Sequence, residues 1–503
     1  MVDVLLTHSY HLYFDRKQAR KMKPYPPLGT LYAASVLRTQ GFTVALFDSM
    51  LENPEIHFEA ALRQHRPRIV VVFEDSFNFL SKMCLQRMRE LSFLILDASK
   101  QSQALTIVHG SDATDHQEDY LERGFDYVLI GEAEWTLLEL VQSLLQGQLE
   151  RIPSIPGIAY RSPASSRRIN TPPRRLMRNL DLLPLPAWDL IDGDRYRFLW
   201  EENHGYFSLN LVSSRGCPYL CNWCAKPIYG NSYSVRSPEK VAFEMAYLKE
   251  LWAPDQLWFA DDIFALPPHW VEQFSQAVRQ KNAVIPFKIQ SRVDLMTLPT
   301  ARHLADAGCC EVWMGAESGS QQILKAMDKG IEVSQIKAAC DNLKTAGIRR
   351  CFFLQFGYPG ERWEDIRKTI DLVRATQPDD IGVSVSYPLP GTKFHQKVLD
   401  QLGSKTNWED SEDLAMLFQG TYTSEFYHAL RDALHFEVKL ARWRRERRND
   451  PRPARYSPDF SLETDQVADE RLQELWDKVT NQEIVCRNAH PTIMEENPAW
   501  ICS

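Results

Sequence analysis

The stretch SSRGCPYLCNWCAK, from Ser213 to Lys226, places Cys217, Cys221 and Cys224 within eight residues of a chain that has ten cysteines. Four thiolates so close together would complete a structural zinc site. Three thiolates can instead hold a cubane 4Fe–4S cluster and leave one iron with an open coordination position, where a small chelating ligand can bind and receive an electron. The alternatives are a zinc site completed by a side chain such as His204, and a chance grouping.

The composition is typical of a protein with several domains. The chain has 503 residues, 44% of them hydrophobic, which is enough for two or three domains with their own cores. The formal net charge of −8 gives no electrostatic reason to expect a nucleic-acid partner. Local basic runs such as RRLMR and RWRRERR are typical of solvated helix faces, with a partner-binding site as the alternative.

The N-terminal segment and the apolar runs predict a cytoplasmic protein. MVDVLLTHSYHLYFDRK has a short apolar run and no small-residue cleavage site, so it indicates a buried strand and not a signal peptide. No apolar run approaches the roughly 18–20 residues of a membrane span. Cytosolic thiols stay reduced, so a cysteine cluster there is more often a metal site than a set of disulfides.

Residues 1–150 alternate short apolar strands with amphipathic helical stretches such as LGTLYAASVLRTQG. This alternation predicts an α/β fold with a doubly wound, Rossmann-like parallel sheet, whose ligands bind past the carboxyl ends of the strands. The predicted strands are Val2–Thr7, Thr43–Phe47, Arg68–Phe73, Ala104–Val108 and Tyr127–Ile130.

Residues 207–400 carry a second βα series, and the cysteine stretch directly follows its first strand. Six strands are too few for a closed eight-stranded barrel, so they predict an open, partial (β/α)6 barrel with its mouth at the carboxyl ends of the strands. The predicted strands are Phe207–Ser213, Gln256–Ala260, Phe287–Ser291, Cys310–Gly315, Cys351–Phe356 and Ile381–Tyr387.

Residues 151–206 and 401–503 lack this βα rhythm. The first segment is dense in proline and arginine, and it is predicted to be an ordered linker with little regular structure, laid across both domains. The second is predicted to be a small helical C-terminal region. Aromatic residues near helical spacing in it indicate a core stripe, or else a cap over the barrel mouth. These residues are Phe426, Tyr427, Phe436 and Trp443.

A cysteine motif of this spacing at the mouth of a βα series resembles that of the radical S-adenosylmethionine superfamily. The resemblance implies that the free iron chelates the amino and carboxylate groups of S-adenosylmethionine. An electron, from a donor such as flavodoxin or ferredoxin, then cleaves the sulfonium to give a 5′-deoxyadenosyl radical. Trp223 fills the position that packs near the adenine in this superfamily. The protein must exclude water and hold the substrate carbon close to the radical.

Polar residues at the ends of the next two strands match the superfamily in order. Asp261 and Asp262 follow the second strand, where the superfamily keeps groups for the ammonium of the cofactor, with a helix N-cap pair as the alternative. Ser291 and Arg292 follow the third strand, near the ribose and carboxylate contacts of the superfamily. For the arginine, a surface position is the alternative.

The stretch WMGAESGS places Glu317 and Ser318 after the fourth strand and resembles a signature of the cobalamin-linked branch of the superfamily. Glycine lets the backbone approach a ligand, and the two polar side chains can bond hydroxyl groups, whereas the alternative is a plain turn into the next helix. After the last two strands, Gln355, Tyr358 and Tyr387 are predicted to face either the substrate or the barrel wall.

The N-terminal domain resembles the cobalamin-binding domain that precedes the radical fold in this branch, and GEAE at residues 131–134 matches it. Two features depart from it. The loop THSYHLYFDRK lacks the Asp-x-His-x-x-Gly of the methionine-synthase type, and His109 replaces a glycine, where it either crowds the ligand or hydrogen-bonds it. A scaffold without cobalamin is the alternative. The predicted contacts to the cobalamin tail are Asp48, Ser111 and Thr114.

The other cysteines are predicted to have no metal role. Cys309 and Cys310 are neighbours in a strand and face opposite ways, so joint ligation of one metal is difficult. Cys84, Cys340 and Cys351 are predicted core residues, and no role is assigned to the two C-terminal cysteines, Cys486 and Cys502.

Three classes of function are compatible with the sequence. The domain order favours a cobalamin-dependent methyltransferase that methylates an unactivated carbon of a small metabolite and uses S-adenosylmethionine both as oxidant and as methyl donor to cobalt. A non-methylating cyclase, oxidase or rearrangement enzyme of the same architecture is the alternative. A cobalamin or iron–sulfur sensor is the third class, and the carboxylates at the strand ends argue against it.

Overall fold

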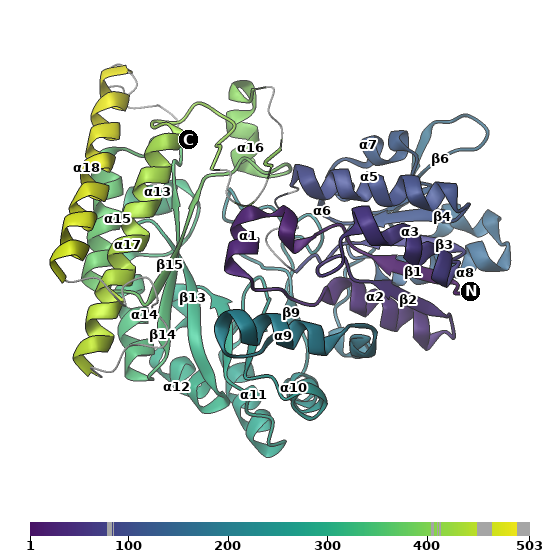
Figure 1. Cartoon of the computed structure of the whole chain (residues 1–503), viewed down its shortest axis with the longest axis horizontal. Coiled ribbons are helices and arrows are strands. Elements are labelled where there is room, and N and C mark those ends of the chain that lie inside the picture. Colours follow the sequence, from purple (N-terminus) through teal and green to yellow (C-terminus); the bar gives the residue numbers. More distant parts are fainter. Residues whose placement is uncertain are drawn as a thin grey trace.

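The computed structural model describes residues 1–77, 83, 85–403, 407–409, 411, 414–449 and 465–489. Cys84 and Cys502 lie outside the described residues. Two open sheets lie next to each other, and two long helices, α17 (Ser424–Asn449) and α18 (Asp465–Ala489), lie on the far side of the second sheet (Figure 1). No helix within the described residues is long and apolar enough to cross a membrane.

The first sheet has the strand order β2-β1-β3-β4-β5-β6-β7, and its first five strands are parallel. All five were predicted from the sequence, and the structure confirms them to within two residues. The connections reverse direction between β1 and β3, which is where ligands bind in doubly wound sheets. The bounds are β1 Val4–Thr7, β2 Val44–Phe47, β3 Ile69–Phe73, β4 Leu105–His109, β5 Tyr127–Leu129, β6 Ile158–Arg161 and β7 Arg168–Asn170.

Helices cover both faces of this sheet, as the apolar strands require. One core forms between the sheet and the helices α2 (Leu28–Thr39) and α8 (Glu134–Gln146). A second core forms on the other face against α3 (Pro54–His65), α5 (Gln86–Gln101) and α7 (Gln117–Arg123). The doubly wound α/β prediction is therefore confirmed.

The predicted linker, residues 151–206, contains more regular structure than expected. β6 and β7 add two antiparallel strands to the first sheet, and α9 (Gly193–His204) is a twelve-residue helix. The expectation of little regular structure was therefore wrong. Pairing with β6 satisfies the backbone hydrogen-bonding groups at the free edge of β5. These hydrogen bonds outweigh the low strand propensity of a proline-rich segment.

The second sheet is an open half-barrel of six parallel strands in the order β15-β14-β13-β12-β11-β8, as predicted. The strands are β8 Ser208–Leu211, β11 Gln256–Phe259, β12 Phe287–Ser291, β13 Cys309–Glu317, β14 Arg349–Phe356 and β15 Asp380–Val385. A short ladder of β9 (Ser214–Arg215) and β10 (Ser234–Val235) flanks the cysteine loop.

Alternation along these strands gives the half-barrel two different faces. Residues such as Phe259 and Phe287 point outward and pack edge-to-face on Phe274 of α11 (Pro268–Gln280). The alternate residues point inward, and several are only half-buried. The remaining helices around the half-barrel are α10 Pro238–Trp252, α12 Leu298–Ala307, α13 Gln321–Ala326, α14 Val333–Thr345, α15 Trp363–Thr376 and α16 Lys393–Val398.

The four aromatic residues of the C-terminal region are all buried. Phe426 and Tyr427 belong to the central core cluster, and Phe436 and Trp443 form a smaller cluster between α17 and α18. This burial confirms the core-stripe interpretation and disagrees with an exposed cap over the barrel mouth.

Candidate active site between the two domains

The cysteine loop begins at a glycine whose conformation few other residues adopt. Gly216 has φ of 76°, and a side chain there would run into the carbonyl oxygen of Ser232. The loop is then held from both ends. Lys226 Nζ donates to the carbonyl of Cys217 at 3.0 Å, and Asn222 donates from its side chain to the carbonyl of Ala326 at 2.8 Å.

The three cysteines of the loop form no disulfide within the described residues and are half-buried, whereas Cys309, Cys340 and Cys351 are buried in the core. Burial raises the pKa of the Cys217 thiol, and the charges of Asp262 and Cys221 raise it further against the opposing effect of Lys226. Metal binding would overcome this rise, because a metal holds the thiolate form.

The described residues contain no group of three or more His, Cys, Asp or Glu side chains arranged around a single metal ion. A cubane does not require such a group, because its cysteine ligands bind different irons. The zinc alternative is disfavoured, since His204 is hydrogen-bonded through Nε2 to the carbonyl of Met22 at 2.9 Å.

Arg292 lies against the cysteine loop and not on the surface. Its guanidinium stacks 3.7 Å from the ring centroid of Tyr219, and Nη1 lies 3.9 Å from Sγ of Cys221. Nη2 donates to the carbonyl of Lys329 at 3.0 Å, and Nε donates to Asp294 at 2.9 Å. The arginine therefore places a fixed positive charge beside one of the three thiols.

A buried ion pair lies close enough to Cys221 to interact with it electrostatically. Lys329 Nζ donates to Glu317 Oε1 at 2.7 Å, and both side chains are less than 10% exposed. Burial acts to lower the pKa of Lys329, but the charges of Glu317 and Cys221 outweigh it, so that the pKa is raised. Glu317 has φ of 58°, and a Cβ at Gly315 would lie 2.6 Å from both charged atoms. The glycine in MGAES therefore makes room for the ion pair.

The two neighbouring aspartates have different surroundings. Asp261 is buried and accepts hydrogen bonds from the backbone and hydroxyl of Ser213 and from the hydroxyl of Ser214. Burial raises the pKa of Asp261 to about 6 against these hydrogen bonds. Asp261 thus holds the start of the cysteine loop, whereas Asp262 is half-buried and close enough to Cys217 to affect its titration.

Three other predicted residues are bonded within the protein. The Ser291 hydroxyl donates to the carbonyl of Phe264 at 2.8 Å, and Gln355 donates to the Ser386 hydroxyl at 2.9 Å. The Ser318 hydroxyl is fully buried and shares a 3.2 Å hydrogen bond with Thr369 of α15. This position favours the plain-turn alternative for Ser318.

Trp223 and the two predicted tyrosines differ in whether protein groups already serve as partners of their side chains. The indole Nε1 of Trp223 is buried and has no hydrogen-bond partner within the described residues. An unsatisfied buried donor on the cysteine loop fits a missing acceptor such as an adenine nitrogen. Tyr358 instead bonds Asn222 and the carbonyl of Ala326, and Tyr387 packs edge-to-face on Trp408, so both belong to the wall.

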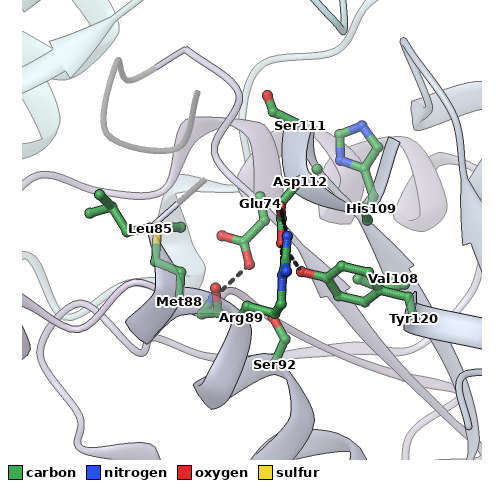
Figure 2. Close-up of a pocket in the computed structure, with 13 residues that line it drawn as sticks. Glu74, Leu85, Met88, Arg89, Ser92, Val108, His109, Ser111, Asp112 and Tyr120 are labelled. Carbon is green, nitrogen blue, oxygen red and sulfur yellow. Dashed lines mark hydrogen bonds and ion pairs between the residues drawn. The ribbon is translucent and has the colours of Figure 1, made fainter. Parts of the chain in front are cut away.

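A pocket opens at the carboxyl ends of β3 and β4 in the first sheet (Figure 2). Arg89 and Tyr120 converge on Asp112 there, with a paired Arg89–Asp112 contact at 2.5 and 2.6 Å. Glu74 Oε2 and the Ser111 hydroxyl are buried beside it without partners among the described residues. Buried polar atoms of this kind fit a polar ligand such as the nucleotide tail of cobalamin.

The other predicted tail contacts are already bonded. Asp48 accepts from the hydroxyl of Tyr196 at 2.7 Å, and Thr114 accepts from the backbone of Gly131 at 3.4 Å. His109 donates from Nε2 to the carbonyl of Gly131 at 2.9 Å, which leaves Nδ1 as a buried acceptor without a partner among the described residues. Burial lowers the pKa of His109 to about 4, so the ring is neutral at physiological pH.

The two domains meet at a buried charge triad that the sequence analysis did not predict. Arg215, two residues before Cys217, donates to Glu132 and Glu134 at 2.6 Å each. All three side chains are at most 5% exposed. These glutamates are the two acidic residues of GEAE, and the ring of Phe77 stacks on Tyr229 beside them at 5.7 Å. The loop ends of the first sheet therefore pack directly on the cysteine loop.

Comparison with known protein families agrees with this geometry. The B12 binding domain matches residues 23–141, and the radical SAM superfamily matches residues 211–373. The chain is a radical SAM enzyme with a B12-binding domain. Its cofactors are accordingly S-adenosylmethionine, a 4Fe–4S cluster and cobalamin, and the unpartnered polar atoms around Trp223 and Ser111 fit these groups.

Relatives of this radical SAM enzyme include both methyltransferases and cyclases. An uncharacterised methyltransferase of Pyrococcus horikoshii is 26% identical over 389 residues, which cover 76% of this chain and 81% of that protein. An anaerobic magnesium-protoporphyrin IX monomethyl ester cyclase of Rubrivivax gelatinosus is 23% identical over 394 residues, which cover 75% and 67%.

Two solved structures share the fold. The methyltransferase TsrM from Kitasatospora setae, with cobalamin and a 4Fe–4S cluster bound, matches with a TM-score of 0.64 and 19% identity over 79% of this chain and 74% of that one. The cobalamin-dependent radical enzyme OxsB, with aqua-cobalamin and S-adenosylmethionine bound, matches with a TM-score of 0.67 and 16% identity over 100% and 82%. The expected pairing of a Rossmann-like domain with a partial barrel is therefore confirmed.

Proposed function

We propose that this radical SAM enzyme is a cobalamin-dependent C-methyltransferase that acts on a small metabolite. The observation that carries this proposal is the direct contact between the two cofactor domains through Arg215, Glu132 and Glu134. Methyl transfer to a substrate radical needs the methyl carrier and the radical source at one substrate carbon. The similarity to the uncharacterised methyltransferase of Pyrococcus horikoshii, which covers 81% of that protein, also supports the proposal.

In this proposal Cys217, Cys221 and Cys224 hold the cluster, and Asp262 and Arg292 lie beside them. Asp262 supplies a negative charge for the ammonium of S-adenosylmethionine, and Arg292 supplies a positive charge for its carboxylate. Glu317, fixed by its ion pair, and the indole N–H of Trp223 are left for the ribose and the adenine. The bound cofactors supply a 5′-deoxyadenosyl radical and a transferable methyl group.

The protein residues serve chiefly to fix positions and to exclude water. Arg215 is stacked among Tyr32, Phe77 and Tyr229, with its guanidinium carbon 5.3–5.5 Å from the three ring centroids. This aromatic enclosure seals the junction between the domains on one side of the cysteine loop. A sealed junction protects a reactive radical from side reactions.

The test uses full-length protein reconstituted anaerobically with iron, sulfide and cobalamin, and S-adenosylmethionine that carries a trideuteromethyl group. We expect one cobalamin per chain, formation of 5′-deoxyadenosine after reduction, and a trideuteromethyl group on the extracted cobalamin. Formation of 5′-deoxyadenosine without any label on cobalamin would reject methyl transfer and favour the second candidate.

The second candidate is a non-methylating radical enzyme of the same architecture. Its support is the similarity to the anaerobic cyclase of Rubrivivax gelatinosus, which covers three quarters of this chain. A count of methyl groups in the product distinguishes the two functions once a substrate is in hand.

A further inference from the structure

The inner face of the half-barrel carries charged and aromatic side chains that the cofactor sites do not use. We define this face as the half-buried residues of the second sheet that point away from the covering helices: Trp258, Lys288, Gln290, Trp313, Phe353 and Ser384. Trp313 and Phe353 stack with centroids 5.0 Å apart. Gly382 of the neighbouring strand β15 lies beside Phe353, and a Cβ at Gly382 would be 3.2 Å from the Phe353 ring.

A segment of the N-terminal domain lies across one end of this face. Tyr25 packs edge-to-face on Trp258 with ring centroids 6.0 Å apart, and Asn210 of β8 donates to the carbonyl of Pro26 at 3.0 Å. Trp200 of α9 holds the same segment through the carbonyl of Pro24 at 2.8 Å. Lys23, which directly precedes it, is exposed and is close enough to Lys288 for its charge to lower the pKa of that amine.

Lys23 and Lys288 have no anionic partner. Neither amine makes a hydrogen bond or an ion pair within the described residues, and Lys288 Nζ lies over the face of Trp258, 5.6 Å from its centroid. Glu311, the register partner of Lys288 on the neighbouring strand β13, is occupied by Arg349 at 2.9 Å and by the indole of Trp313 at 2.7 Å.

The electrostatics of Lys288 agree with the lack of an ion-pair partner. Burial lowers the pKa of Lys288 to about 8, and the charge of Lys23 adds to the effect, whereas the nearby groups Glu311, Cys310 and Cys351 oppose it. Lys21 and His435 lie in the same region, and burial and then neighbouring lysines lower their pKa values, whereas Asp380 and Asp15 act to raise the pKa of Lys21. Neither Lys23 nor Lys288 is in an ion pair within the described residues, so both amines are available to an anionic ligand.

We propose that Lys23 and Lys288 bind an anionic group of the substrate, such as a carboxylate or a phosphate, at the inner face of the half-barrel. The apolar part of the substrate lies against Trp258 and extends toward the cysteine loop. Lys288 is near the amino end of β12 and Arg292 follows its carboxyl end, so at about 3.3 Å per residue the two levels are roughly 13 Å apart. The carbon attacked is therefore on the order of 10 Å from the anionic group.

This inference rests on the proposed radical function but is tested without it. Pyridoxal 5′-phosphate, an aromatic aldehyde with a phosphate, forms an imine with an unprotonated amine with loss of water, and borohydride then reduces the imine to a stable secondary amine. The full-length reconstituted protein is labelled in this way, and modified lysines are located by peptide mass spectrometry. Pyridoxal without the phosphate is the matched probe, and the exposed Lys337 of α14 is the reference lysine.

We expect the phosphorylated probe to label Lys288 at least about tenfold faster than Lys337, because the lowered pKa of Lys288 frees its amine and neighbouring cations attract the phosphate. Inorganic phosphate and the Lys23→Gln substitution should each slow the labelling of Lys288 several-fold, while Lys337→Gln should not. Equal preference for pyridoxal and its phosphate at Lys288 would overturn the inference.

The same preparation is assayed for 5′-deoxyadenosine and for the labelled methyl group on cobalamin. Selective labelling without 5′-deoxyadenosine supports an anion site but rejects its role in a radical reaction. Radical formation without selective labelling rejects the anion site and leaves the proposed function in place. The Lys337→Gln variant, which changes only the exposed reference lysine, is expected to form 5′-deoxyadenosine at the rate of the unaltered enzyme when no substrate is present.

Discussion

Arg215 and Glu134 form a buried ion pair at 2.6 Å that joins the cysteine loop of one domain to the ligand-binding edge of the other. Glu132 binds the second arm of the same guanidinium, so one arginine connects both acidic residues of GEAE. Burial of three charges is costly, and the contact persists because each is paired and enclosed by aromatic rings. This contact fixes the position of the cysteine loop relative to the carboxyl edge of the first sheet.

Replacement of Arg215 by methionine is expected to destabilise the protein by about 3–5 kcal/mol, since it leaves two buried carboxylates without a cation. Urea unfolding monitored by tryptophan fluorescence measures the loss. The matched control removes the exposed ion pair of Arg38 and Asp189 with Arg38→Gln, which should cost less than about 1 kcal/mol. An Arg215 variant as stable as this control would contradict the role of the triad.

Substitution of Cys217, Cys221 or Cys224 by alanine is expected to abolish cluster assembly. In the proposed cluster each thiolate binds its own iron, and no other described cysteine is in the loop to replace it. Iron content and the electron resonance spectrum of the reduced protein are the measurements. Cys340→Ala, which removes a buried core thiol, should retain full iron loading. Iron loading that is unchanged in all three loop variants would refute the cluster site.

Asp262→Asn is expected to weaken binding of S-adenosylmethionine about tenfold, or about 1.4 kcal/mol, because it removes the charge proposed to face the ammonium group. Asp261→Asn is the matched control, since this neighbour is occupied by Ser213 and Ser214. Equilibrium dialysis should therefore show a larger effect at 262 than at 261. The reverse order would assign the cofactor contact to Asp261.

Glu361 predicts a distinct pH dependence of stability. Burial raises the pKa of Glu361 to about 8 from an ordinary value near 4.5, so the folded protein holds a proton that the unfolded chain has released. The free energy of unfolding should accordingly fall as pH rises from about 4.5 to about 8. The Glu361→Gln variant should lack this pH-dependent loss of stability. In urea titrations its free energy of unfolding, relative to that of the unaltered protein, should therefore increase between pH 5 and pH 8. An equal difference at both pH values would show that Glu361 does not titrate in this range.

The strand–helix order and the location of the cysteine loop could be predicted from the sequence because both are local patterns. Short apolar runs marked the predicted parallel strands, and amphipathic stretches marked the helices between them. Three cysteines in eight residues required no tertiary information. The extension of the first sheet by β6 and β7 was missed, because proline-rich segments pair only when an open sheet edge is available.

Only the tertiary structure decided which of the predicted polar residues are bonded within the protein and which lie near the thiols. Adjacent aspartates look alike in the sequence, yet Asp261 is bonded to the loop start and Asp262 lies near the thiols. Lys23 and Lys288 are 265 positions apart, and only the packing of the N-terminal segment on Trp258 brings them together. Burial, pairing and pKa depend on distances between residues remote in the chain, which no local pattern contains.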